Sequence, residues 1–175
     1  ATLLQRLHNH EIDAAILATE HPETDFKSIL LYKEPFWLAF PQKHAFYNQD
    51  EISQQDLDNT DLLLLSEGHC LATQAMQACH ITERNQQGEM ANLRASSLET
   101  LLQLVSAGYG TTLVPALALN GPWISGRGVI TRELNLPNTW RYVSMIYRAS
   151  FPRFSALEAL SQTIKTNLPS TVEKL

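Results

Sequence analysis

Cys70 and Cys79 are the only cysteines of the chain, and their spacing points to redox chemistry. They lie nine positions apart, and the segment between them contains no Gly or Pro, which predicts a helix. Nine helical residues rise about 13–14 Å and turn through about 900°, so the two side chains would lie on opposite faces. A disulfide needs Cα atoms within about 7 Å of each other. The pair therefore cannot bond while this helix exists, which is the geometry of a redox switch.

The surroundings of Cys70 favour a reactive thiol. Cys70 follows the turn Ser66-Glu67-Gly68, where a predicted strand ends and the helix begins. Free N–H groups at a helix start favour the thiolate, which is the form that attacks peroxide. His69 could donate a hydrogen bond or a positive charge, and Gly68 allows close backbone approach.

A disulfide between these cysteines is energetically reasonable. Peroxide converts a thiolate to a sulfenic acid, which a second thiol converts to a disulfide, and Cys79 is the only intramolecular candidate. Closing a ring of about ten residues contributes about 2.5–3 kcal/mol in the loop-entropy model. Ordering about two helical turns involves a similar free energy, so a small redox driving force could convert one state into the other.

Other readings of the same residues stay open. An isolated cysteine is more often a small buried hydrophobe than a nucleophile. His69-Cys70 and Cys79-His80 offer four zinc ligands, although adjacent residues rarely both reach one ion. A thiol peroxidase-like enzyme would need a base and an orienting group, and only His69 stands beside Cys70. A small-molecule-binding domain without a redox role is the third alternative.

Composition narrows the class of protein. The 175 residues are 44% hydrophobic and 18% charged, as in an ordinary globular protein. No apolar run reaches the roughly 18 residues of a membrane span, and the first residues lack the features of a signal peptide. The start of the chain reads as the middle of a helix, so we expect a fragment of a longer protein. A net charge of −5 without a Lys/Arg cluster makes this chain a poor nucleic-acid binder by itself.

Helical and strand patterns alternate along the chain, which predicts an α/β fold with a largely parallel sheet. Ser96 and Glu99 form the pattern of a capping box and open a helix. A last helix begins near Pro152, with apolar residues from Phe154 to Leu168 at near-helical spacing. The predicted strands are 12–17, 36–40, 62–65, 111–114, 129–134 and 142–147.

Three segments resemble the effector-binding domain of LysR-type transcriptional regulators, and their order and spacing agree across most of the chain. They are Glu11–Leu17, Glu34–His44 and the Gly-x-Gly-x-x-Leu-x-Pro turn at Gly108–Pro115. The resemblance implies an α/β fold of two lobes like those of periplasmic binding proteins. Lobe I would comprise 1–33 and 143–175, and lobe II, with the redox site, 34–142. It also implies that the first strands of lobe I and an N-terminal helix-turn-helix domain are missing from this chain.

Two further motifs resemble the peroxide-sensing branch of that family. They are Gly68-His69-Cys70-Leu71-x-x-Gln74-Ala75-Met76-x-x-Cys79 and Arg94–Leu101. The resemblance implies that Cys70 reacts with hydrogen peroxide and that Cys79 resolves it into a disulfide. It assigns Gly68, His69, Cys70 and Ser97 to peroxide binding and thiolate activation. Ala72-Thr73 replace the Arg-Asp of the branch, where the acidic residue is implicated in proton handling, so peroxide sensitivity does not carry over from the family.

The same resemblance implies the biology of the whole protein. We expect a cytoplasmic transcription activator rather than an enzyme, with no cofactor and no bound metal. Its partners would be hydrogen peroxide, DNA through the absent N-terminal domain, and RNA polymerase. The regulatory domains would form a homodimer and the full-length protein a homotetramer, with glutaredoxin or thioredoxin as the reductant.

Overall fold

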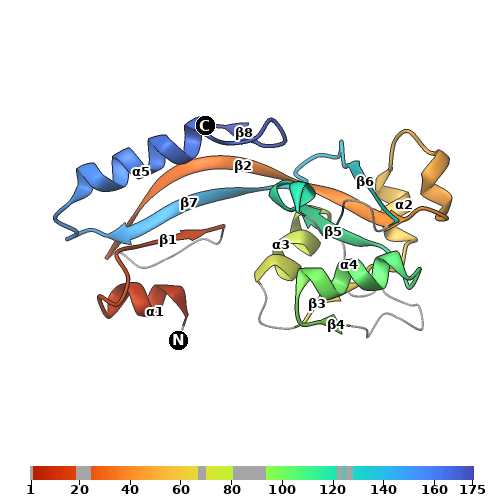
Figure 1. Cartoon of the computed structure of the whole chain (residues 1–175), viewed down its shortest axis with the longest axis horizontal. Helices are drawn as coiled ribbons and strands as arrows, with labels where there is room; N and C mark the ends of the chain where they lie inside the picture. Colours follow the sequence, from red (N-terminus) through yellow and green to blue (C-terminus); the bar gives the residue numbers. More distant parts are fainter. Residues whose placement is uncertain (1, 19–24, 67–69, 81–93, 122–123, 125–127) are drawn as a thin grey trace. The chain divides into compact units, whose positions relative to one another are not determined.

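The computed structural model describes residues 2–18, 25–66, 70–80, 94–121, 124 and 128–175 (Figure 1). The chain divides into two compact units. Unit 1 comprises Ala1–Glu34 and Arg141–Leu175, and unit 2 comprises Pro35–Trp140. No helix in the described part of the chain is long and apolar enough to cross a membrane.

Unit 1 consists of a β-sheet and two helices, one near each end of the chain. The helices are α1 (Leu3–His8) and α5 (Phe154–Thr166). The strands are β1 (Ala14–Leu17), the first part of β2 (Phe26–Pro41), most of β7 (Trp140–Arg148), and β8 (Glu173–Lys174). The strand order is β1-β7-β2, with β8 paired to β2. Leu7 of α1 packs with Phe26 and Ile146 in a small buried core.

Two buried charged groups tie distant segments of unit 1 together. The Glu34 side chain is 1% exposed, and its carboxylate lies 2.8 Å from the guanidinium of Arg141. The Arg148 guanidinium donates to the backbone carbonyls of Leu7 and Ile12, which anchors the connection between α1 and β1. Each charge therefore has the polar partners that its burial requires.

Unit 2 is built on the second part of β2, which pairs with β5 (Thr112–Pro115) and β6 (Val129–Glu133). A second small sheet joins β3 (Leu64–Leu65) to β4 (Arg94–Ala95). The helices are α2 (Gln54–Asp58), α3 (Cys70–Ala78) and α4 (Leu98–Ser106), with the 3-10 helices η1 (Ala45–Asn48) and η3 (Ala116–Asn120). Helix α4 packs against β3, β4 and β5.

The prediction of a mixed α/β fold is confirmed, but that of a largely parallel sheet is wrong. Among the described residues, the pairs that β2 makes with β5, β6 and β8, and that β1 makes with β7, are antiparallel. Alternating helices and strands predict parallel pairing only when each helix returns the chain to the same end of one sheet. Here the chain leaves unit 1 along β2 and returns along β7. Parallel pairing occurs at β3 and β4, with α3 between the two strands, and at the bridge between Leu62 and Thr111.

One local prediction needs correction. The N-cap of α4 is Ser97, not Ser96, because the helix begins one residue later than the capping-box pattern indicates. The Ser97 side chain caps this start, and Leu101, Leu102 and Val105 of the helix are buried in an apolar core of unit 2. The predicted last helix is confirmed as α5; its Leu157 is buried, while Phe154 and Leu160 are 41% and 47% exposed.

Candidate functional site

The strand that precedes α3 is firmly held. The four leucines Leu62–Leu65 are all at most 5% exposed, as expected for a strand buried on both faces. Leu64 and Leu65 pair with Arg94 and Ala95, and Ser66 then donates its backbone N–H to the Ala95 carbonyl at 2.9 Å. The chain therefore approaches α3 from a fixed point.

The structure starts α3 at Cys70, so the predicted helix is confirmed. Cys70 stands at the first helical position, where free backbone N–H groups favour negative charge. Gly68, His69 and the Cys70 side chain lie outside the described residues. Their assigned roles in peroxide binding and thiolate activation remain predictions.

Cys79 directly follows the last residue of α3, and its thiol is free and completely buried. It lies in one of two apolar cores of unit 2, called the Cys79 core from here on. The other buried members of the Cys79 core are Phe36, Leu38, Phe40, Phe46, Ile52, Leu57, Leu62, Ala75, Leu113 and Leu134. Desolvation by this burial raises the pKa of the Cys79 thiol to about 12. The thiol is thus held in its neutral, weakly nucleophilic form.

Three backbone features mark the end of α3. The Cys79 N–H donates to the Ala75 carbonyl at 3.0 Å, which completes the last helical turn. The Cys79 carbonyl accepts a hydrogen bond from Nε2 of Gln54 at 2.9 Å. His80 then adopts the left-handed conformation, with φ of 53°, and is exposed. Because Cys79 is buried and His80 exposed, the adjacent pair is poorly placed to bind one zinc ion together.

Several side chains of α3 pack against the rest of unit 2. Ala75 is 2% exposed and belongs to the Cys79 core, Leu71 is partly buried against it, and Met76 is only half-buried. Leu71 and Ala72 also pack against the second apolar core of unit 2, around Leu101 and Val105, so the described side chains of α3 contact both cores. That this helix melts at low cost remains a prediction.

Ser97 is exposed at the start of α4, where its hydroxyl accepts a hydrogen bond from the Thr100 N–H at 3.2 Å. The same oxygen lies 3.0 Å from the Thr100 hydroxyl. These contacts assign Ser97 a capping role. Its predicted part in peroxide binding remains a prediction, because the Cys70 side chain is not described.

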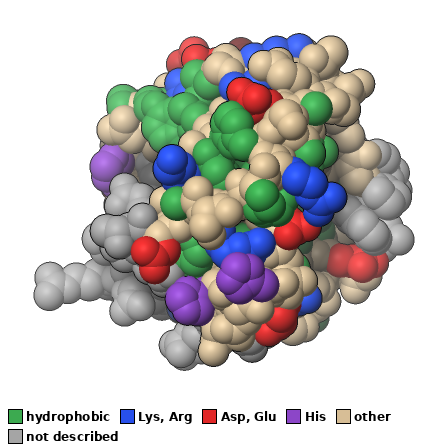
Figure 2. Space-filling model, turned by 90° about the vertical axis from the view of Figure 1, so that its left-hand side faces the viewer, with side chains coloured by type: hydrophobic (Ala, Val, Ile, Leu, Met, Phe, Trp, Pro, Cys, Tyr) green, Lys and Arg blue, Asp and Glu red, His purple; other side chains and the backbone are tan. Residues whose placement is uncertain are grey.

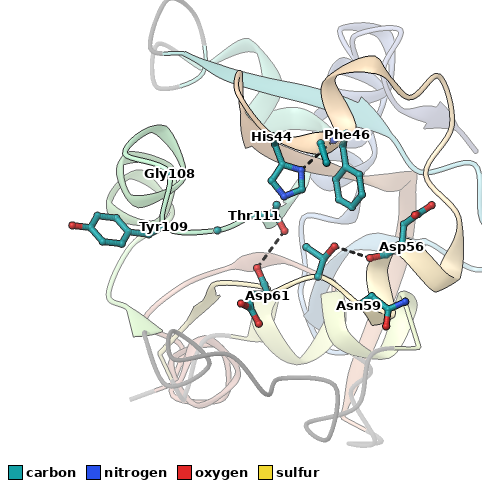
Figure 3. Close-up of a pocket in the computed structure, with 11 residues that line it drawn as sticks. His44, Phe46, Asp56, Asn59, Asp61, Gly108, Tyr109 and Thr111 are labelled. Carbon is teal, nitrogen blue, oxygen red and sulfur yellow. Dashed lines mark hydrogen bonds between the residues drawn. The ribbon is translucent and has the colours of Figure 1, made fainter.

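A cavity of about 490 Å³, which the sequence does not predict, lies between the loop before η1, the end of α2 and the turn at Gly108–Gly110 (Figure 3). His44 points into it, and Nδ1 of its ring accepts a hydrogen bond from the Phe46 N–H at 3.3 Å. Desolvation lowers the pKa of His44. The only sequence feature that pointed to this region was the Gly-x-Gly turn. Gly110 of that turn passes so close to Asp61 and Leu63 that a Cβ there would lie 3.1 Å from the Asp61 carbonyl oxygen.

The described residues offer no metal centre. Within the described residues, no group of three or more His, Cys, Asp or Glu side chains is placed to hold a metal ion. His69 and the Cys70 side chain, two of the four ligands in the zinc alternative, are not among them.

Comparison with known proteins places this architecture. Residues 1–169 match the family model described as the LysR substrate binding domain. The hydrogen peroxide-inducible genes activator of Dickeya chrysanthemi is 35% identical over 173 residues, which cover 99% of this chain and 55% of that protein. The DNA-binding transcriptional dual regulator OxyR of Escherichia coli K12 is 34% identical over 173 residues, which again cover 99% of this chain and 55% of that protein. The chain thus spans about half the length of these curated relatives.

Solved structures agree with these relatives. A reduced form of OxyR from N. meningitidis has a TM-score of 0.84 and 28% identity, over 99% of this chain and 79% of that one. A hydrogen peroxide-bound mutant of OxyR from Corynebacterium glutamicum has a TM-score of 0.80 and 31% identity, over 94% of this chain and 51% of that one. The resemblance to the peroxide-sensing branch is confirmed, and the chain belongs to the LysR substrate-binding-domain family.

Proposed function

We propose that this chain is the redox-sensing regulatory domain of a peroxide-responsive LysR-type transcription regulator. The observation that carries the proposal is the placement of Cys70 and Cys79 at the two ends of α3. The nine residues of α3 separate the cysteines by about 13–14 Å along the helix axis. Reduced Cys79 stays buried, and bond formation requires α3 to unfold.

The chemistry balances with hydrogen peroxide as the oxidant. The Cys70 thiolate attacks one peroxide oxygen, hydroxide leaves, and a sulfenic acid forms on Cys70. The sulfur of Cys79 then attacks the Cys70 sulfur as its thiol proton is lost, and hydroxide leaves again. The two thiols lose two electrons in total, hydrogen peroxide gains them, and two waters form.

The consequences extend to the whole protein. Unit 1 would act as lobe I, and unit 2 as lobe II. Refolding of α3 would alter the arrangement of two regulatory domains in a homodimer, and of the homotetramer formed by the full-length protein. In this proposal the protein is cytoplasmic, and a preceding helix-turn-helix domain binds DNA. The rearrangement changes the contacts of the protein with RNA polymerase, and glutaredoxin or thioredoxin later reduces the disulfide.

The test combines mass spectrometry with hydrogen exchange. Reduced protein treated with hydrogen peroxide should lose both thiols and two hydrogens, and the amides of Leu71–Ala78 should lose protection from exchange. Cys79→Ser should consume one equivalent of peroxide at Cys70 without losing that protection, and Cys70→Ser should do neither. Unchanged protection across Leu71–Ala78 after the disulfide has formed would falsify the switch.

A turnover assay separates the proposal from a thiol peroxidase. With excess peroxide, thioredoxin and a reductant for thioredoxin, a sensor should consume peroxide slowly, while an enzyme should sustain rapid turnover.

A further inference from the structure

Gln54 of α2 is hydrogen-bonded to the end of the helix that carries the cysteines. Its Nε2 lies 2.9 Å from the Cys79 carbonyl oxygen and 3.0 Å from Oδ1 of Asp58. The Cys79 carbonyl belongs to the residue directly after α3, where carbonyl groups have no donor within the helix. Gln54 therefore supplies a hydrogen bond that α3 itself cannot make.

Gln54 is held in place by its own helix. Ser53 and Asp56 form a complete capping box at the start of α2, in which each side chain accepts from the other residue's backbone. Leu57 of the same helix is 1% exposed and belongs to the Cys79 core. The donor at Gln54 is thus positioned by a capped helix that is anchored in the core around the Cys79 thiol.

His80 destabilises the same end of α3 that Gln54 stabilises. It lies just beyond Cys79, at the position where glycine is preferred because the backbone is left-handed there. Any residue with a Cβ is strained in that conformation. The end of α3 is therefore stabilised from α2 by Gln54 and weakened from within by His80.

We propose that Gln54 is a positioning residue that holds Cys79 in the helical, buried state and so sets how readily Cys79 resolves an oxidised Cys70. This inference rests on the proposed function. In the resolving step, the Cys79 sulfur bonds to the Cys70 sulfur, the S–O bond of the sulfenic acid breaks, and the Cys79 proton leaves with the hydroxide as water. Cys79 must leave the core for this step, and the hydrogen bond from Gln54 opposes that movement.

The experiment uses three variants of the full chain. Gln54→Leu removes the amide donor and keeps a side chain of similar size. His80→Gly relieves the left-handed strain. Gln55→Leu is the matched control, because Gln55 is the next residue of α2 and is exposed.

Hydrogen peroxide starts the reaction, and quenched samples are analysed by mass spectrometry for sulfenic acid trapped by dimedone and for disulfide. Gln54→Leu should speed conversion of sulfenic acid to disulfide by about two- to tenfold, the range for loss of one hydrogen bond. His80→Gly should slow it, and Gln55→Leu should leave it unchanged. Formation of the sulfenic acid, measured with Cys79→Ser in the background, should be the same with and without the Gln54 change.

Hydrogen exchange at the Cys79 amide, in reduced protein, is an independent readout. Gln54→Leu should increase exchange there and His80→Gly should decrease it, and both effects need no peroxide chemistry. If wild-type protein forms no Cys70–Cys79 disulfide, the proposed function fails while this readout still tests the role of Gln54. If the disulfide forms but Gln54→Leu matches Gln55→Leu in resolution rate and in exchange, the role of Gln54 is overturned.

Discussion

Burial disfavours the charged forms of two titratable side chains of unit 2, and each has a measurable consequence. The Cys79 thiol is fully enclosed by apolar groups, which raises its pKa to about 12. The His44 ring packs against Phe46, with ring centroids 4.4 Å apart, and desolvation lowers its pKa. The first effect concerns reactivity and the second concerns stability.

Cys79 should resist alkylation in the folded, reduced protein. Iodoacetamide reacts with the thiolate, and both burial and the raised pKa keep that form scarce at Cys79. Labelling at graded pH, followed by peptide mass spectrometry, should show Cys70 modified first and Cys79 modified only after unfolding in urea. Equal labelling rates at the two cysteines in folded protein would contradict the assignment of Cys70 as the reactive thiol.

His44 should make the protein less stable as the pH falls below about 6.5. The unfolded chain binds a proton at His44 near its ordinary pKa of 6.5, whereas the folded protein binds it only at lower pH. The free energy of unfolding therefore decreases as the pH falls from 6.5 to the folded pKa. Urea unfolding of wild-type protein and His44→Asn at pH 5 to 8 tests this.

Asn keeps an acceptor for the Phe46 N–H, so it serves as a non-titrating substitute in that comparison. The slope of stability against pH in this window should be smaller in His44→Asn than in wild type. Parallel curves would show that His44 does not contribute.

At the scale of single elements, local sequence predicted what local interactions determine. The absence of Gly and Pro was enough to predict α3, and the run Leu62–Leu65 was enough to predict a buried strand. The extent of β2 was underestimated because Pro35 indicated a boundary. The strand continues through it because its two halves pair with different distant segments, Tyr32 with Lys174 and Phe36 with Pro115.

In the candidate site, too, local features could be predicted from the sequence and contacts between distant segments could not. The cysteine positions and the start of α3 followed from spacing and helix propensity. The burial of Cys79 could not be predicted, because it depends on core residues from Phe36 to Leu134 that are distant in sequence. The contact from Gln54 is similarly hidden, since it spans 25 positions and one side-chain amide has no periodic signal.

The start of α4 can be tested by two neighbouring serines. Ser97→Ala should lower the free energy of unfolding by about 1 kcal/mol, because the Thr100 N–H loses its acceptor. Ser96→Ala should have a much smaller effect, because Ser96 is exposed and precedes the N-cap. Urea unfolding of both variants is the measurement, and an equal loss at Ser96 would restore the capping box expected from the sequence.

At the scale of the whole molecule, unit 1 exposes several large apolar side chains. Large hydrophobic side chains are exposed on β1, β2 and α5, and Figure 2 shows hydrophobic side chains gathered on one face. The exposed apolar side chains of unit 1 include Ile16 at 49%, Leu30 at 42% and Leu160 at 47% exposure. Grouped apolar side chains of this kind are typical of association surfaces rather than of free surface.

We therefore expect this chain to self-associate, in keeping with the homodimer predicted from the family resemblance. Leu160→Glu should shift the equilibrium toward monomer, because a carboxylate on α5 would have to be desolvated in an apolar interface. Tyr109→Glu is a control of matched exposure, since Tyr109 is 49% exposed but belongs to unit 2. Light scattering and sedimentation over a range of concentrations, on reduced and oxidised protein, would decide the matter. Wild-type protein that stays monomeric in both redox states would contradict a dimer formed through these domains, and an equal effect of the two substitutions would remove unit 1 as its surface.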